Sequence, residues 1–307
     1  MIDNVRLYVN PKDRFENHIT SNNVIDLEAF VDTCTGELKE YPKRGKERNL
    51  DIKITQSSAS ICGSLHKYEN LCFKEENQNH NDFCFKQMKY LIPHLLELFD
   101  MEGKTCLTNL EMGFNIKLDN NPQKLIDNNI LMYDLKNHNK DMKFSGKGDY
   151  KEFQKTDYSL KIYNKSKQYK LNDNILRIEI KITKKRLLQK LEVYSIEDLL
   201  KKDVLFRVFS LLCHEFEKVL IIDNFDSFEI PLKDLEKLNK YTNPNYWTRI
   251  RDDKSYKVRN RLKKDFDLLI NRYNLSTTKK ELQEKLLLKF WFLINLNDQE
   301  LTTERIA

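Results

Sequence analysis

The sequence predicts an α+β protein in which helices pack on one face of a central antiparallel β-sheet, with a helical extension at the C-terminal end. Two patterns support this prediction. Short segments alternate apolar with charged side chains, which is typical of strands that have one buried and one solvated face. Longer segments repeat apolar residues three and four positions apart, which is typical of helices that bury one side. At 307 residues the chain is long enough for two domains.

Three segments show the strand pattern most clearly, at residues 109–118, 159–165 and 176–182. Only a short polar turn separates the last two segments, so we expect them to pair as an antiparallel hairpin. The opening residues VRLYV predict another strand, and residues 50–68 predict a hairpin that bends near Gly63. The sheet is therefore expected to contain at least these strands, with their apolar side chains on one common face.

Helical spacing predicts four longer elements, at residues 83–101, 196–220, 256–275 and 277–296. The first two are strongly apolar, so we expect them to cover the apolar face of the sheet. A break near Asn243-Pro244 precedes the last two, which are rich in cations. We therefore expect one domain at residues 1–242 and a basic helical region at residues 243–307.

The composition is that of a folded and highly charged protein, with 40% hydrophobic, 11% aromatic and 33% charged residues. This much apolar material is too much for a disordered chain. We find no apolar run of the ~20 residues that a membrane span needs, and the first residues lack the layout of a signal peptide, so we expect a cytoplasmic protein. Six scattered cysteines without a CxxC pair predict neither a zinc site nor a disulfide framework.

The net charge of +6 is unevenly distributed, because the cations concentrate at residues 136–170, 181–190 and 249–264. Such segregation predicts a surface for a polyanion, and nucleic acid is the commonest polyanion that a cytosolic protein meets. The alternative is a solvated basic surface that reflects only the Lys and Asn enrichment of an AT-rich genome. The residues expected to contact DNA are Lys147, Lys151, Arg177, Lys181, Arg249, Arg251, Lys257, Arg259, Arg261, Lys263 and Lys264.

The polar faces of the strands carry groups that suit chemistry on a phosphate. Lys161, Tyr163 and Lys165 alternate onto one face, so a tyrosine hydroxyl lies between two ammonium groups. Flanking cations favour the phenolate and hold a phosphodiester for attack by the tyrosine. Glu111 and Glu179 are expected to bind a divalent metal, Mg²⁺ or Mn²⁺, because hard cations prefer oxygen ligands.

His66, in the segment SLHKY, is expected on a strand as a third metal ligand or a proton carrier. Each of these residues also has a structural interpretation. Tyr163 is a good strand former, Glu179 is flanked by Arg177 and Lys181 as in an ordinary ion pair, and a lone histidine is more often structural. The residues alone leave both interpretations open.

An ordered set of motifs resembles the rolling-circle replication initiators of filamentous phages and plasmids. The motifs are GSLHKYEN, NHNDF, NLEMGFNI, IYNK at residues 162–165 and LRIE at residues 176–179. The resemblance covers roughly residues 1–230 and implies a site-specific, metal-dependent DNA nickase that forms a 5′-phosphotyrosine and leaves a 3′ hydroxyl as primer. It implies Tyr163 as nucleophile, with Lys161 and Lys165 at the phosphate and Glu111, Glu179 and His66 at the metal.

One departure from that family concerns the histidines, because the chain has no His-hydrophobic-His pair. Tyr158 and Tyr169 are rival nucleophiles. The origin of replication is the expected partner, with a host helicase and polymerase as further partners. Two other functions stay open from the sequence: a non-catalytic initiator or repressor that binds DNA, and a relaxase or transposase of a mobile element.

Overall fold

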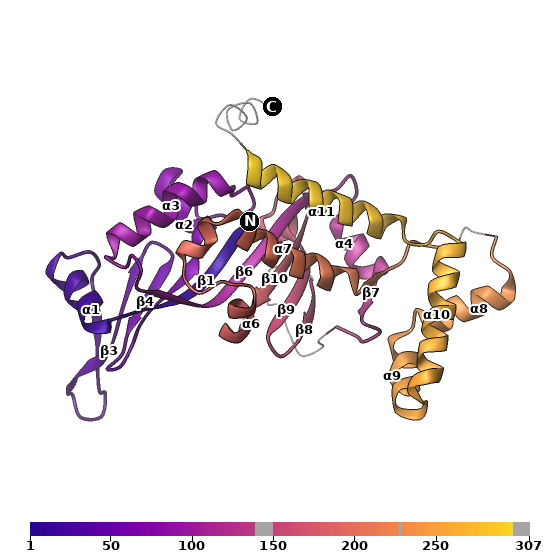
Figure 1. Ribbon diagram of the computed structural model, residues 1–307, viewed down its shortest axis with the longest axis horizontal. Coiled ribbons are helices and arrows are strands. Elements are labelled where there is room, and N and C mark those ends of the chain that lie inside the picture. The colour runs from indigo at the N-terminus through magenta and orange to yellow at the C-terminus, as the bar shows by residue number, and fades with distance from the viewer. Residues whose placement is uncertain (139–149, 227–228, 297–307) are drawn as a thin grey trace.

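The computed structural model describes residues 1–138, 150–226 and 229–296, and a nine-stranded antiparallel sheet runs through its centre (Figure 1). In spatial order the strands are β2 (Glu28–Val31), β3 (Leu38–Glu47), β4 (Leu50–Ile54), β5 (Ala59–Ser64), β1 (Ile2–Val9), β6 (Thr105–Lys117), β10 (Ile175–Ile182), β9 (Tyr158–Asn164) and β8 (Tyr150–Gln154). The predicted α+β class with a central antiparallel sheet is confirmed.

The central strands pair as their side-chain patterns predict. β9 and β10 form the expected antiparallel hairpin, in which Glu179 lies opposite Lys161. β6 borders β10 on its other side, and there Glu179 lies opposite Gly113. The polar residues of these three strands therefore share one face, because successive side chains on each strand alternate between faces.

Three helices cover the apolar face of the sheet: α3 (Phe85–Leu98), α7 (Lys202–Glu217) and α11 (Thr277–Asn295) (Figure 1). Phe114 of β6 connects them to the sheet, since its ring lies 5.5 Å from that of Phe209 and 6.2 Å from that of Phe290. The rings of Phe209 and Phe290 stack at 4.0 Å. Each fully buried phenylalanine contributes roughly 1.5–3 kcal/mol to stability. The three helices leave the opposite, polar face of the sheet to shorter segments, which include residues 79–81.

Shorter elements fill the connections. They are α1 (Lys12–Ser21), α2 (Leu65–Phe73), α4 (Pro122–Lys124), a π-helical turn (Leu125–Asn129), α5 (Lys165–Tyr169), α6 (Lys185–Lys190), a 3₁₀ turn (Glu197–Leu200) and a two-stranded sheet of β7 (Ile130–Tyr133) and β11 (Val219–Ile221). None of the helices in the described part of the chain is both long and apolar enough to cross a membrane.

The predicted hairpin at residues 50–68 forms, but its second strand ends earlier than expected. β4 and β5 pair antiparallel, and β5 stops at Ser64, where α2 begins. The Ser64 hydroxyl accepts a hydrogen bond from the backbone N–H of Lys67 at 3.1 Å, which is the geometry of a helix N-cap. The prediction of His66 on a strand is therefore wrong, because it lies in the first turn of α2.

A second apolar cluster lies away from the sheet, around α8 (Leu232–Tyr241), α9 (Pro244–Asp253) and α10 (Tyr256–Arg272) (Figure 1). Its centre is Trp247, whose indole N–H donates to the carbonyl of Tyr241 at 2.7 Å. α11 returns from this cluster to the main core. The described helices after residue 243 therefore divide between two cores, and the separation of residues 243–307 from residues 1–242 as a domain stays a prediction.

Candidate active site

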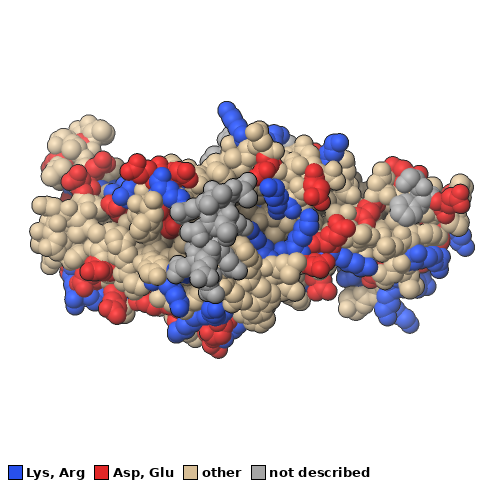
Figure 2. All heavy atoms as spheres, turned by 90° about the horizontal axis from the view of Figure 1, so that it is seen from above, with Lys and Arg blue, Asp and Glu red and all other residues tan. Residues whose placement is uncertain are grey.

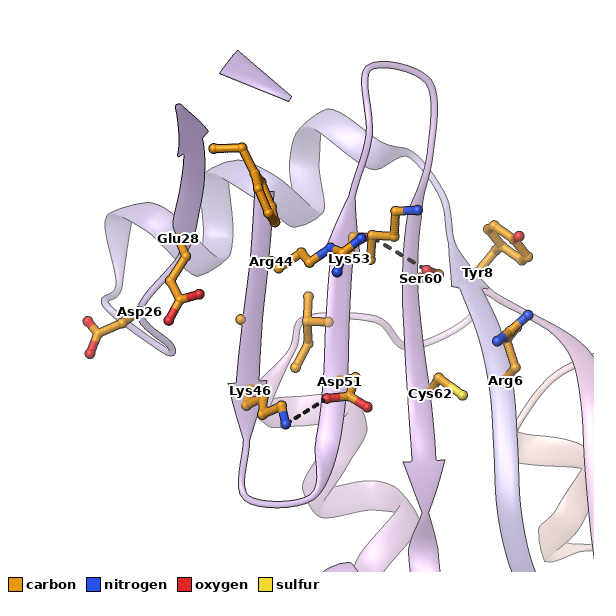
Figure 3. A pocket seen from close by; sticks show the side chains of 13 residues that line it. Arg6, Tyr8, Asp26, Glu28, Arg44, Lys46, Asp51, Lys53, Ser60 and Cys62 are labelled. Atoms are coloured by element: carbon orange, nitrogen blue, oxygen red, sulfur yellow. Dashed lines mark hydrogen bonds and ion pairs between the residues drawn. The ribbon is translucent and has the colours of Figure 1, made fainter. Parts of the chain in front are cut away.

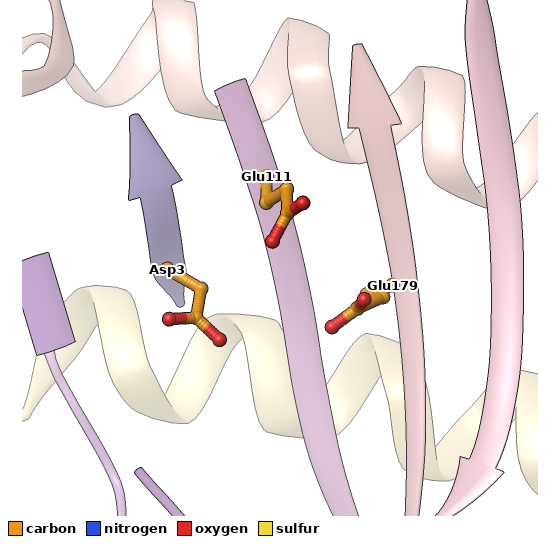
Figure 4. A group of neighbouring side chains, drawn as sticks. All are labelled: Asp3, Glu111 and Glu179. Carbon is orange, nitrogen blue, oxygen red and sulfur yellow. The ribbon is translucent and has the colours of Figure 1, made fainter. Parts of the chain in front are cut away.

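Three carboxylates meet on the open face of the sheet. Asp3, Glu111 and Glu179 come from the adjacent strands β1, β6 and β10, and their ligand oxygens all lie within 4.8 Å of one another (Figure 4). All three side chains are buried. Buried carboxylates at this spacing repel one another unless cations stand beside them.

An irregularity of β1 brings Asp3 into this cluster. Ile2 pairs with Met112 and Val5 with Leu110, so two residues of β1 stand opposite the single residue Glu111. This is the geometry of a β-bulge, which changes the direction in which side chains point. Strict alternation would put Asp3 on the same face as Val5, in the core. With the bulge, Asn4 also faces the open side, where its Nδ2 donates to Oε2 of Glu111 at 2.6 Å.

Gly113 makes room at the centre of the cluster. A Cβ atom at this position would lie 2.6 Å from Cβ of Glu179 and 2.9 Å from a terminal nitrogen of Arg177. Real Cβ atoms do not approach other heavy atoms so closely. The absence of a side chain at Gly113 therefore lets the Arg177 guanidinium group lie between the carboxylates.

Cations balance the three carboxylates. Arg177 donates to Oδ2 of Asp3 at 2.8 Å and to Oε2 of Glu179 at 2.7 Å. Lys181 Nζ lies 2.6 Å from Oε1 of Glu111. Lys161 Nζ lies 3.6 Å from Oε1 of Glu179. Three cations therefore stand beside three anions, and this pairing offsets the desolvation penalty of burying the charges.

The surroundings shift the pKa values of the three acids in different directions. Burial, followed by the charge of Glu179, raises the pKa of Glu111. Burial also opposes ionisation of Glu179, but Arg177 and then Lys161 outweigh it and lower the pKa of Glu179. Asp3 behaves in the same way, because Arg177 holds its pKa below the ordinary value despite burial. Glu111 is therefore the carboxylate that accepts a proton most easily.

Tyr163 reaches this cluster from β9. Its hydroxyl donates to Oε2 of Glu179 at 3.2 Å, and its side chain lines a cavity of about 600 Å³ together with Glu111 and Lys161. Burial and then the charge of Glu179 raise the pKa of Tyr163 well above its ordinary value. The phenol is therefore protonated at neutral pH in this arrangement, and it becomes a stronger acid only when the negative charge beside it is neutralised.

Lys165 approaches the site from the helix that follows β9. It is the first residue of α5, and its Nζ donates to Oδ1 of Asn79 at 2.7 Å. The amide of Asn79 in turn donates to Oδ2 of Asp3 at 2.7 Å. Burial, and after it the positive charge of Arg177, lowers the pKa of Lys165 to about 7. Its ammonium group lies 5.6 Å from the centre of the Tyr163 ring.

His66 lies beside the carboxylate cluster and is not one of its members. Its Nε2 is within hydrogen-bond distance of Oδ1 of Asn81, at 2.7 Å, and its ring stacks on that of Phe83 at 5.2 Å. Burial lowers its pKa well below the ordinary value, so the ring is neutral. Asp3, which the sequence analysis does not name as a candidate, takes the place in the cluster that the sequence suggested for His66.

The rival tyrosines lie in different environments. Tyr158 packs against the main core beneath the sheet, on the face opposite Tyr163. The hydroxyl of Tyr169 donates to Oδ1 of Asn79 at 2.5 Å, next to Lys165. Tyr150 is a further tyrosine, not among the candidates that the sequence offers. It lies on β8 directly opposite Tyr163 of β9 and lines the same cavity. The hydroxyl of Tyr163 donates directly to a carboxylate of the cluster, that of Glu179.

A scan against models of protein families finds no match, and neither does a search of curated proteins. A solved structure of a rolling circle replication initiator protein from Geobacillus stearothermophilus is similar to this chain with a TM-score of 0.39 and 9% sequence identity. The alignment covers 75% of this chain and 88% of that chain.

Three of the residues expected to contact DNA, Lys151, Arg177 and Lys181, belong to the sheet. Lys147 lies outside the described residues. Lys151 donates to the carbonyl of Ile130, and burial lowers its pKa. Arg177 is buried inside the carboxylate cluster, while the side chain of Lys181 is 36% exposed. The interactions of Lys151 and Arg177 are therefore with the protein itself.

The other expected DNA contacts lie on α9 and α10, at the end of the molecule where Figure 2 shows many Lys and Arg side chains. Arg249, Lys257, Arg261, Lys263 and Lys264 are exposed, and Arg251 and Arg259 are half-buried. A cavity of about 390 Å³ on this unit is lined by cations and by the exposed ring of Tyr256. The cations of this cavity are Lys136, Arg251, Arg259 and Lys263.

Proposed function

We propose that this protein is a DNA nicking-and-joining endonuclease that initiates rolling-circle replication of a phage or small plasmid. The observation that carries the proposal is the position of Tyr163, whose hydroxyl lies 3.2 Å from a carboxylate of the buried triad and beside an open cavity of about 600 Å³. A phenol, a metal-ligating triad and nearby ammonium groups are the parts that tyrosine attack on a phosphodiester requires.

The triad suits a hard divalent cation. Asp3, Glu111 and Glu179 offer only oxygen ligands, which Mg²⁺ and Mn²⁺ prefer, and no thiol is needed. Such a cation, when bound, neutralises charge on the phosphate and on the triad. Asp3 replaces His66 in this ligand set, because the carboxylate oxygens of Asp3 are the ones within reach of Glu111 and Glu179.

The residues of the chain then have separate tasks in one balanced step. The Tyr163 oxygen forms a bond to phosphorus as the bond between phosphorus and O3′ of the DNA breaks, and the phenol proton leaves as O3′ takes up a proton. The number of phosphoester bonds is unchanged, so the reverse reaction rejoins the strand without ATP. Lys161, 3.6 Å from Glu179, and Lys165 supply positive charge for the phosphate oxygens.

In this proposal the cations of α9 and α10 hold the DNA. Arg249, Lys257 and Arg261 are exposed and suit contacts to phosphates. Such contacts fix the position of the duplex and carry no information about its base sequence. The division into a nicking domain at residues 1–242 and a DNA-binding region at residues 243–307, a cytoplasmic location and the recruitment of a host helicase and polymerase belong to the same proposal.

A non-catalytic DNA-binding protein is the second candidate, and one observation favours it. Each carboxylate of the triad already has a cation or hydrogen-bond donor, so the cluster is electrically balanced without a metal. In that case the triad and Arg177 would serve stability alone. A relaxase or transposase would use the same tyrosine chemistry and differ in its DNA substrate.

The two candidates are distinguished by nicking of a supercoiled plasmid that carries the gene and its flanking DNA, in the presence of Mg²⁺ or Mn²⁺. We expect Glu111→Gln and Glu179→Gln to lose nicking by about 100-fold or more while they keep DNA affinity. Glu215→Gln is the matched control, because Glu215 is an equally buried glutamate on α7, away from the site. Undiminished nicking by the two triad variants would exclude the proposed site.

The non-catalytic candidate predicts a different outcome in the same experiment. The wild-type protein would then bind the plasmid without cutting it at any concentration of divalent metal. Removal of a negative charge at Glu111 or Glu179 would strengthen DNA binding, because the repulsion of the phosphates falls.

A further inference from the structure

A second and larger cavity, of about 860 Å³, lies on the open face over the half of the sheet that the proposed chemistry does not use (Figure 3). It spans β3, β4, β5 and β1 and is bordered by β2. Its residues include four cations, three acids and two aromatic rings: Arg6, Arg44, Lys46, Lys53, Asp26, Glu28, Asp51, Tyr8 and Phe30.

The strand register arranges these side chains in two rows across the sheet. In the first row Arg44 pairs with Lys53, Lys53 with Ser60, and Ser60 with Tyr8. Residues that pair across neighbouring strands lie about 5 Å apart, so this row is about 15 Å long. The second row runs parallel to it through Lys46, Asp51, Cys62 and Arg6.

The charges of the cavity are not evenly mixed. Asp51 is engaged by Lys46 at 3.4 Å, and Asp26 and Glu28 stand at the outer edge of the cavity in Figure 3. Arg44 and Lys53 line the middle of the cavity and Arg6 lines its far side on β1, and all three are exposed (Figure 3). A ligand that lies across the strands therefore meets positive charge at its centre.

Two aromatic rings stand beside these cations and are open to solvent. Tyr8 is 37% exposed and Phe30 is 40% exposed. The guanidinium group of Arg44 lies 5.1 Å from the centre of the Phe30 ring, which orients it by a cation–π contact. Exposed aromatic rings on the face of a sheet, interleaved with cations, are the features that bind unpaired bases and the phosphates between them.

We propose that this cavity is a binding groove for single-stranded DNA, in which bases stack on Tyr8 and Phe30 and phosphates contact Arg6, Arg44 and Lys53. The faces of bases in a duplex are hidden by stacking, so the rings favour a single strand over a duplex. This inference rests on the proposed function, because it assigns the groove to the strand that Tyr163 cuts.

The groove leads directly to the carboxylate cluster. Lys46, Asp51 and Cys62 line both cavities, so the two cavities adjoin on the open face. On β1, Tyr8 and Asn4 face the same side, and four residues of extended strand span about 13 Å. Asn4 donates to Glu111 of the triad. A strand held at Tyr8 therefore reaches the triad within a few nucleotides.

The test measures binding without chemistry. A fluorescent oligothymidylate of about 16 nucleotides is titrated with the full chain in EDTA, and a duplex of the same length serves as the second probe. We expect Tyr8→Ala and Arg44→Ala each to weaken single-strand binding by about ten-fold or more, with little change in duplex binding. Tyr90→Ala is the matched control, because Tyr90 is an exposed tyrosine, at 65%, on the covering helix α3.

Wild-type affinity of both variants for the single strand would overturn the inference, as would a wild-type protein that binds only the duplex. Because EDTA removes the metal, these outcomes do not depend on nicking. A failure of the proposed function is recognised separately, by the absence of metal-dependent nicking in a protein whose single-strand binding responds to Tyr8→Ala as expected.

Discussion

The hydroxyl of Tyr163 and the guanidinium group of Arg177 donate to the same carboxylate oxygen, Oε2 of Glu179, over 3.2 Å and 2.7 Å. Burial and then the charge of Glu179 therefore raise the pKa of the phenol and keep it protonated, while Arg177 keeps Glu179 ionised despite its burial. A cation bound to the triad would draw charge away from this oxygen and so release the phenol proton more easily. A cation bound to the triad would in this way make Tyr163, the proposed nucleophile, more reactive.

The triad and Lys181 make a prediction about metal affinity. Lys181 Nζ holds Oε1 of Glu111 at 2.6 Å, so it competes with a metal for this oxygen. We expect Lys181→Met to strengthen Mn²⁺ binding by about two- to five-fold in isothermal titration calorimetry, because a pair of this exposure is worth at most about 1 kcal/mol. Lys185→Met, at an exposed lysine of α6, is the control. Weaker Mn²⁺ binding by Lys181→Met would contradict this competition.

Gly113 makes a prediction about packing. A methyl group there collides with the side chains of Glu179 and Arg177, neither of which has room to move because both are buried. We expect Gly113→Ala to lower the free energy of unfolding by about 1–3 kcal/mol and to abolish Mn²⁺ binding. Urea unfolding and calorimetry measure the two effects.

Gly103→Ala is the comparison for this variant. Gly103 has a φ of +65° and nothing within 4 Å of its Cβ position, so the substitution strains the backbone away from the site. We expect it to cost roughly 1–2 kcal/mol and to leave Mn²⁺ binding unchanged. Normal metal binding by Gly113→Ala would show that Arg177 does not need the space above this glycine.

The buried amine of Lys165 predicts a pH dependence of stability. Its pKa is lowered to about 7 in the folded protein, whereas an unfolded lysine titrates near 10.4. Between these values the unfolded state binds more protons than the folded state, so the Lys165 contribution to stability rises with pH from about 7 to about 10 and is unfavourable below.

Lys165→Met isolates this contribution, since all other titrating groups are common to both proteins. We expect the free energy of unfolding of the wild type to rise relative to the variant by a few kcal/mol, on the order of the pKa shift, between pH 6.5 and 9.5. Urea denaturation at several pH values measures it. A constant difference across this range would mean that Lys165 titrates in the folded protein as it does in the unfolded chain.

The sequence predicts the members of this site only where a strand keeps an unbroken alternation of side chains. Alternation was sufficient to bring Glu111, Glu179 and Tyr163 to one face, and the short turn was sufficient to pair β9 with β10. Asp3 could not be found in this way, because a bulge in β1 reverses the side to which it points. His66 was assigned to the wrong element because the N-cap at Ser64 ends a strand whose apolar pattern continues.

Regions without a buried face were equally hard to predict. β2 and β3 at the edge of the sheet are exposed for much of their length, so residues 11–49 carry no alternating pattern. The sequence shows that α11 has an apolar side, but it does not show which part of the protein that side packs against. Its residues Leu286 and Phe290 pack on the sheet, beyond the separate cluster of α8 to α10.

The cations of α9 and α10 make a prediction about salt dependence. Arg251 and Lys263 line one cavity with the exposed ring of Tyr256. We expect Arg251→Ala and Lys263→Ala each to lower the slope of log affinity for duplex DNA against log salt by about 0.9, the value for one lost phosphate contact. Arg14→Ala, at an exposed arginine of α1 paired with Asp100, should leave the slope unchanged. If all three variants had the same slope, the duplex would not bind at the cavity that Arg251 and Lys263 line.

The central claim is that Tyr163 becomes covalently joined to DNA. The protein is incubated with Mn²⁺ and a supercoiled plasmid that carries its gene and flanking DNA, then digested, and the nucleotide-linked peptide is identified by mass spectrometry. We predict a 5′-phosphate ester on Tyr163 in the wild type, and no adduct but unchanged DNA binding for Tyr163→Phe. An adduct on Tyr150 or Tyr169, or an undiminished adduct in the phenylalanine variant, would contradict the claim.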